Sequence, residues 1–269
     1  KYFFLITRKR MGKLIEVGVG FSENDDSATA IKEASKGALI GDKVPSLTLI
    51  FYAGEYNAKE INKTMLDTFG ETEFVGGSTD AVVYHGNIHP KGVVIASLYS
   101  EYVHFGVASM DNISKNPKKL ASKTIRNAVH QINMDRYVDS YMAYSRVKKG
   151  NLTELIRMPS FFAFAFTRGF QPTKMGNEDL IIDGIGESIG YYIPVFGGSL
   201  GNDMDKVFKN IPYEITSLHS GKIMKDGLIT VFASTDLKYA SSIAHGAEPL
   251  NKLGYISEVK NDGFVVSRI

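Results

Sequence analysis

Two glycine-rich segments carry groups suited to binding a small ligand. Residues 76–80 and residues 197–203 each come at the end of an apolar run that predicts a buried strand. In open α/β sheets ligands bind beyond the carboxyl ends of strands, and consecutive glycines there let backbone N–H groups approach an anion closely. The alternative is that these glycines only permit tight strand exits. The predicted ligand-binding residues are Gly76, Gly77, Ser78, Thr79, Asp80, Gly197, Gly198, Ser199, Gly201, Asn202 and Asp203.

Arg168 is the predicted countercharge for such a ligand. It follows the apolar run Phe161–Phe166, whose alternation is typical of a strand buried on both faces. If this strand and the one before Gly197 are parallel neighbours, Arg168 emerges at the same sheet edge as the second glycine segment. A guanidinium there can pair a ligand carboxylate through two hydrogen bonds.

Ser199 also permits an enzyme hypothesis. Gly197-x-Ser199-x-Gly201 matches the nucleophile elbow of serine hydrolases, and it follows a predicted strand. Asp226 or Asp236 with His245 would complete the chain order Ser, Asp, His. The elbow needs a helix directly after the serine, however, and residues 202–212 have no apolar helical stripe. We therefore expect no catalysis and keep a serine hydrolase as an alternative.

Composition and charge exclude several other classes of protein. The chain has 269 residues, of which 43% are hydrophobic, and this balance is ample for a sizeable core. The net charge of +2 argues against a nucleic-acid binder, and the absence of cysteine excludes disulfides and thiolate metal sites. His85 and His89 lie in a predicted turn without nearby carboxylates, so we expect no metal site. No apolar run approaches the roughly 20 residues of a membrane-spanning helix, so we expect no membrane insertion and a cytoplasmic protein.

Internal repeats predict the arrangement of the elements that position these residues. Four landmarks recur in the same order: two Pro-led strands, the two Gly-Gly-Ser segments, two Gly-bounded turns and the strands that follow them. The last predicted strands of the two copies are 102–108 and 239–244. Helices are predicted between the landmarks, at residues 25–40, 57–69, 117–128, 134–147 and 177–189.

The predicted fold is therefore α/β, with two similar halves from internal duplication, each a sheet of mixed strands flanked by helices. We place an N-terminal extension at residues 1–11, the first half at 12–112 and the second half at 113–269.

The order of these motifs resembles the N-terminal region of the FIST family (F-box and intracellular signal transduction). The resemblance rests on the strand and helix at residues 15–40, on both Gly-Gly-Ser segments and on the closing His245-Gly246-x-x-Pro249. It covers nearly the whole chain. In this family a C-terminal FIST region usually follows, and that region is absent from this sequence.

The resemblance implies a sensory input module of a signalling protein, which binds a small molecule such as an amino acid or small carboxylate. It also implies an output partner such as a histidine kinase, and a homo-oligomer is left open. No cofactor is expected. Because some family members are reported as haem-based nitric-oxide sensors, a haem-binding gas sensor is the runner-up. His245 heads the closing motif and is a candidate ligand contact or haem ligand.

Overall fold

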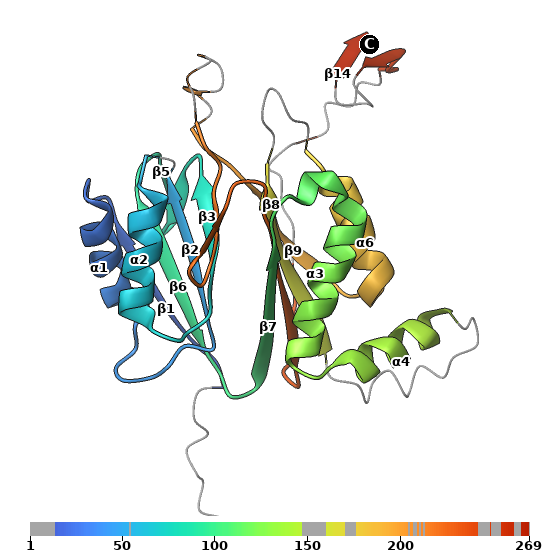
Figure 1. Ribbon diagram of the computed structural model, residues 1–269, viewed down its shortest axis with the longest axis horizontal. Helices are drawn as coiled ribbons and strands as arrows, with labels where there is room; N and C mark the ends of the chain where they lie inside the picture. Colours follow the sequence, from blue (N-terminus) through green and yellow to red (C-terminus); the bar gives the residue numbers. More distant parts are fainter. Residues whose placement is uncertain are drawn as a thin grey trace, which may run out of the picture. The chain divides into compact units, whose positions relative to one another are not determined.

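The computed structural model describes residues 14–53, 55–146, 160–169, 176–203, 205–206, 209, 211, 213–241, 248, 254–260 and 265–268. The chain divides into two compact units, Lys1–Lys238 and Tyr239–Ile269. Residues 1–11, predicted as an extension, and His245 lie outside the described residues. The larger unit holds both Gly-Gly-Ser segments and both main sheets (Figure 1).

The first sheet has six strands, in the order β1-β6-β2-β3-β10-β11. Their bounds are β1 Glu16–Ser22, β6 Val93–Tyr99, β2 Leu47–Ala53, β3 Phe74–Thr79, β10 Ser217–His219 and β11 Lys222–Met224. β2 and β3 are parallel, whereas β6 is antiparallel to both β1 and β2. β10 pairs with β3 in the antiparallel sense, with Leu218 opposite Gly76. The helices α1 (Ser27–Ala38) and α2 (Ala58–Phe69) cover one face of this sheet.

The second sheet has four strands, in the order β7-β12-β8-β9. Their bounds are β7 Val103–Met110, β12 Leu228–Thr235, β8 Ser160–Arg168 and β9 Val195–Leu200. β12 is antiparallel to both of its neighbours, and β8 and β9 are parallel. One face is covered by α3 (Pro117–Gln131), α4 (Asp135–Arg146) and α6 (Glu178–Ile189), and a short 3-10 helix, η1 (Ile113–Lys115), precedes α3.

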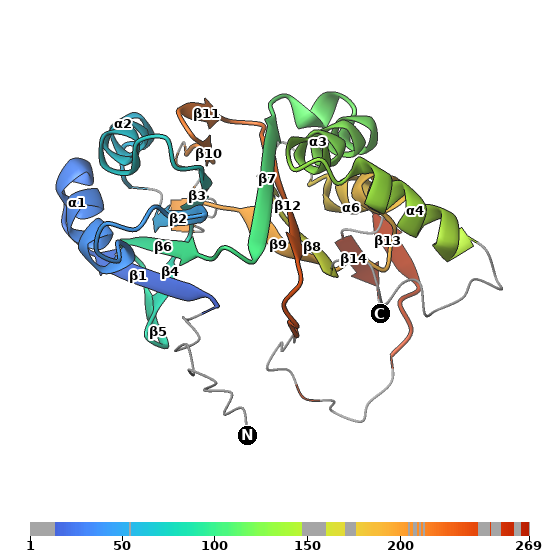
Figure 2. The same cartoon turned by 90° about the horizontal axis from the view of Figure 1, so that it is seen from below.

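The larger unit is a four-layer arrangement of helices, sheet, sheet and helices (Figure 2). Successive side chains of a strand point to opposite faces, so β2 sends Leu47, Leu49 and Phe51 between the sheets and Ile50 and Tyr52 toward α1 and α2. The second sheet contributes side chains of the same kind to the middle layer. Its residues there include Phe164, Phe166, Val107, Ile229 and Val231. The α/β fold class is therefore confirmed.

Local capping explains where the helices begin. Asp26 accepts a hydrogen bond from the Thr29 N–H at the start of α1, and Asn57 accepts two at the start of α2. Pro117 is the first residue of α3, where its missing N–H costs nothing. Gly70 ends α2 with φ +59°. All five predicted helices are present within a few residues of their expected bounds.

The two sheets share one connectivity. The chain follows the same path in both, β1-α1-β2-α2-β3 in one and β7-α3-β8-α6-β9 in the other. In each sheet one later strand lies between the first and second strands of this path: β6 between β1 and β2, and β12 between β7 and β8. Each path is followed by a short hairpin, β4 (Val82–Tyr84) with β5 (Asn87–His89) after the first and β10 with β11 after the second. The duplication of the two halves stays a prediction.

The structure corrects two strand assignments made from the sequence. β7 was expected to end the first half, but it is an edge strand of the second sheet and pairs with β12. Residues 239–241, expected to begin a strand, have no regular secondary structure, and 242–244 lie outside the described residues.

The smaller unit contains the antiparallel hairpin of β13 (Glu258–Lys260) and β14 (Val265–Arg268). Within the described parts of the chain, no helix combines the length and the apolar character needed to cross a membrane.

Candidate functional site

The two predicted Gly-Gly-Ser segments meet at the carboxyl ends of β3 and β9. The Ser78 hydroxyl donates to the Gly201 carbonyl over 2.8 Å, and the Gly201 N–H donates to the Ser78 carbonyl over 3.0 Å. Ser78 is buried, and its hydroxyl also accepts from the Thr216 N–H at 2.9 Å. These bonds join the two segments, and Ser78 ties three segments of the chain together.

The first glycine of each pair serves the packing of parallel strands. Gly76 has φ +149°, and a Cβ atom there would lie 1.7 Å from the Ile50 carbonyl oxygen. Gly197 has φ +126°, and its Cβ would lie 2.0 Å from the Ala165 carbonyl oxygen. No other residue fits such an approach, which accounts for both glycines without a ligand.

A cavity of about 710 Å³ opens next to Ser78, beyond the carboxyl ends of β2 and β3 and at the start of α2. Of the predicted site residues, Ser78 and Asn202 line it. Asn202 is buried and donates from Nδ2 to the Glu214 carbonyl at 2.6 Å, which holds the segment after β9 against the cavity wall. The full lining is Tyr52, Tyr56, Asn57, Ala58, Lys59, Ser78, Asn202, Lys206, Tyr213, Glu214, Thr216, Ile223 and Lys225.

Three tyrosines line this cavity, and their hydroxyls are held within the fold. Tyr52 Oη lies 2.5 Å from Thr216 Oγ1, and burial raises the pKa of Tyr52 to about 12. Tyr56 Oη donates to the Asn24 carbonyl at 2.8 Å, and burial, with nearby carboxylates, raises the pKa of Tyr56. Tyr213 Oη has no hydrogen-bond partner among the described residues, and it is buried, so it does not face the open space of the cavity. Burial raises the pKa of Tyr213, against the opposing effect of the Arg168 charge.

Lysines give the cavity a positive charge. Lys59 is in the first turn of α2, and Lys206 is in the segment after β9. In the part of the chain that the structure describes, neither has an acidic side chain within ion-pair distance. Lys225 is paired with Glu214 at 2.5 Å. Because α2 also begins here, the positive end of its dipole adds to the preference for an anion.

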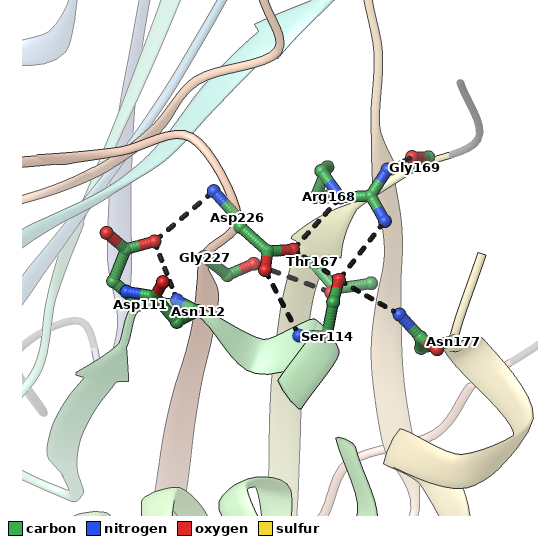
Figure 3. Close-up of polar contacts among 9 residues, drawn as sticks. All are labelled: Asp111, Asn112, Ser114, Thr167, Arg168, Gly169, Asn177, Asp226 and Gly227. Carbon is green, nitrogen blue, oxygen red and sulfur yellow. Dashed lines mark hydrogen bonds and ion pairs between the residues drawn. The ribbon is translucent and has the colours of Figure 1, made fainter. Parts of the chain in front are cut away.

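Arg168 has a structural role instead of an open position (Figure 3). Its side chain is only 2% exposed, and Nε donates to Asp226 Oδ1 at 3.0 Å. Nη1 donates to the Gly169 carbonyl at 3.0 Å and Nη2 lies 3.4 Å from Ser114 Oγ. Asp226 supplies the carboxylate that we expected from a ligand.

The remaining predicted residues lie around the junction but do not line the large cavity. Ser199 Oγ donates to Glu178 Oε1 at 2.6 Å, so its described partner is a carboxylate instead of a histidine. Thr79 Oγ1 donates to the Ala81 carbonyl, and Asp203 Oδ1 accepts from the Asp205 N–H, as expected in turns. Gly77, Asp80 and Gly201 belong to the strand ends that form the junction. Gly197 and Gly198 line a smaller cavity of about 230 Å³ between β9 and α6.

Sequence reasoning missed most of the cavity lining. Tyr56 belongs to the loop after β2, at the edge expected for a ligand, so its position was available as a signal. Tyr213 offered none, because its place depends on the path of residues 213–216 past β3. Among the described residues, no cluster of three or more histidine or acidic side chains is arranged to hold a metal ion.

The fold and the cavity define an α/β module with a polar, positively charged ligand-sized site. The model of the FIST N domain matches residues 46–269, and the chain belongs to the FIST family. No curated protein matches the sequence. A solved structure titled as cyanuric acid hydrolase from A. caulinodans has a TM-score of 0.37 and 9% identity, and the alignment covers 82% of this chain and 71% of that one.

Proposed function

We propose that this chain is a small-molecule sensing module that binds an amino acid or another small carboxylate in the cavity beside Ser78. FIST domains are in general sensory, ligand-binding modules of signalling proteins, and this family membership supports the sensing role. The proposal includes no catalysis of its own and an output partner such as a histidine kinase.

The observation that carries this proposal is a cavity lined by two lysines, Lys59 and Lys206, at the positive end of the α2 dipole. Among the described residues, neither lysine has an acidic side chain within ion-pair distance. A ligand carboxylate supplies the countercharge for both. The cavity volume of about 710 Å³ is ample for an amino acid.

Ser199 and Arg168 give no support to the other hypotheses. The hypothesised triad needs a histidine beside the Ser199 hydroxyl, whereas its described partner is the Glu178 carboxylate. The candidate acid Asp226 is engaged by Arg168 and Ser114. A haem site rested on His245, which lies outside the described residues.

Calorimetric titration with a panel of amino acids and small carboxylates tests the proposal. Lys206→Gln should weaken binding of the tightest ligand by roughly 10-fold or more, because a charge-assisted hydrogen bond contributes about 1.5–3 kcal/mol. Lys119→Gln, an exposed lysine on α3, is the matched control and should change binding by less than about 0.5 kcal/mol. If the parent binds no member of the panel, or if Lys206→Gln binds as tightly, the proposal is wrong.

A further inference from the structure

β3 and β9 hold equivalent places in the two sheets, but among the described strands only β3 has a partner on its outer edge. β10 pairs with β3, and Leu218, opposite Gly76, is fully buried in the core beneath α2. β9 is the last strand of its sheet. Its residues Gly197, Gly198 and Ser199 are exposed, whereas the first five residues of β3 are buried.

Gly77 on β3 and Gly198 on β9 show the difference between the covered and the uncovered edge. A Cβ atom on Gly77 would lie 2.2 Å from the Thr216 carbonyl oxygen, because the chain entering β10 covers this glycine. A Cβ atom on the equivalent Gly198 would meet nothing within 4 Å. Within the described chain, no neighbouring atom requires a glycine at position 198. At position 77 a glycine is needed, because a side chain there would collide with the backbone that enters β10.

The cavity beside β9 is mostly apolar and adjoins Gly197, the counterpart of the Gly76 that Leu218 opposes in the first sheet. This cavity of about 230 Å³ between β9 and α6 is lined by Ile181, Ile182, Val195, both glycines and Glu178, among others. Ile182 is 47% exposed there. A strand paired with β9 as β10 pairs with β3 would place one apolar side chain in this cavity.

The chain also has a hairpin of the matching shape that lacks such a partner. β4–β5 and β10–β11 have the same strand lengths and the same two-residue turn with positive φ at both positions. Val83 corresponds to Leu218 and Ile88 to Ile223, yet Val83 is 63% and Ile88 74% exposed. β4 and β5 pair only with each other among the described strands.

We propose that two copies of this chain associate by β-strand addition, with the β4–β5 hairpin of each copy paired antiparallel to β9 of the other. Exposed strand edges are templates for such pairing, and main-chain hydrogen bonds with one inserted apolar side chain are its usual form. Val83 enters the cavity between β9 and α6 of the second copy. Each copy offers one hairpin and one edge, and the proposed dimer is closed by two identical contacts.

Light scattering after size exclusion, over a dilution series of the full chain, tests the pairing. The parent should be a dimer at high concentration, with twice the monomer mass of 29.6 kDa. Val83→Asp should give a monomer, because it puts a charge into the apolar cavity. Gly198→Val should also give a monomer, because its side chain blocks the incoming strand, whereas its Cβ atom meets nothing within 4 Å in its own copy.

Val44→Asp is the matched control, since Val44 is 78% exposed and far from both elements in sequence, and it should remain a dimer. The melting temperatures of Val83→Asp and Gly198→Val should equal that of the parent diluted to its monomer, which separates lost pairing from lost folding. A parent that is a monomer at every concentration overturns the proposal, and so does a dimer that survives both Val83→Asp and Gly198→Val. Ligand titration is a separate measurement, so failure of the sensing role would not alter these outcomes.

Discussion

The Gly-Gly pairs contain residues of the same type with unlike roles. Gly76 and Gly197 are fixed by their approach to the neighbouring strand, whereas Gly198 has open space around its Cα. Sequence alone could not separate them, because the difference depends on which backbone lies within about 2 Å of the missing side chain. The same limit applies to Arg168, whose position at a strand end was predicted but whose partner, Asp226, comes from a turn 58 residues later.

Arg168→Ala should lower the free energy of unfolding by about 2–4 kcal/mol, because it leaves the Asp226 carboxylate without its buried partner. Urea denaturation measures this loss. Arg126→Ala is the control: its pair with Asp139 has side chains that are 34% and 64% exposed, and such surface pairs contribute about 1 kcal/mol or less. Equal effects of the two substitutions would show that Arg168 has no structural role of this kind.

At the scale of elements, local signals predicted most helices and strands, and pairing between distant strands was not predicted. Asn57, Pro117 and Gly70 mark helix ends through their own backbone chemistry, so the sequence near them was enough. β10 pairs with β3, which lies more than 130 residues earlier in the chain, and no local sequence pattern predicts this pairing. The assignment of β7 to the first half failed for the same reason.

The pairing of β10 with the first sheet brings a histidine between the two sheets. His219 Nε2 lies 3.0 Å from Glu73 Oε2, and His219 Nδ1 lies 2.7 Å from Ser109 Oγ on β7. The hydrogen bond from His219, opposed by burial and aided by Ser220, lowers the pKa of Glu73 below its usual value of 4.5. This contact therefore links the pH dependence of folding to the junction of the sheets.

A carboxyl whose pKa is lower in the folded than in the unfolded state stabilises the fold at pH values above its unfolded-state pKa. This stability is lost as the pH falls through the folded-state pKa. Thermal stability of the parent should therefore decline below about pH 4.5. Glu73→Gln should flatten that decline, measured as melting temperature against pH. Glu71→Gln, an exposed neighbour, is the control. If Glu73→Gln and the parent have the same slope, the contact with His219 has no part in acid stability.

At the scale of the whole molecule, the α/β class and the FIST membership followed from motifs and their order along the chain. The four-layer packing did not, because a strand that is apolar on both faces can be covered by helices or by a second sheet. That packing brings Ser78 and Gly201 together, and with them the cavity that Tyr213 lines. The cavity lies at the sheet edge where a ligand was predicted, but most of the residues that line it come from elsewhere in the chain.

Lys59→Gln tests the central claim most directly, because it removes one cation at the cavity and keeps a polar side chain. In calorimetric titration, affinity for the tightest carboxylate of the panel should fall by roughly 10-fold or more. The melting temperature of the ligand-free protein should not change, since Lys59 is exposed and has no ion pair among the described residues. Lys63→Gln, at an exposed lysine one turn further along α2 that does not line the cavity, should leave both quantities unchanged. Unchanged ligand affinity in Lys59→Gln, with the fold intact, would contradict the account.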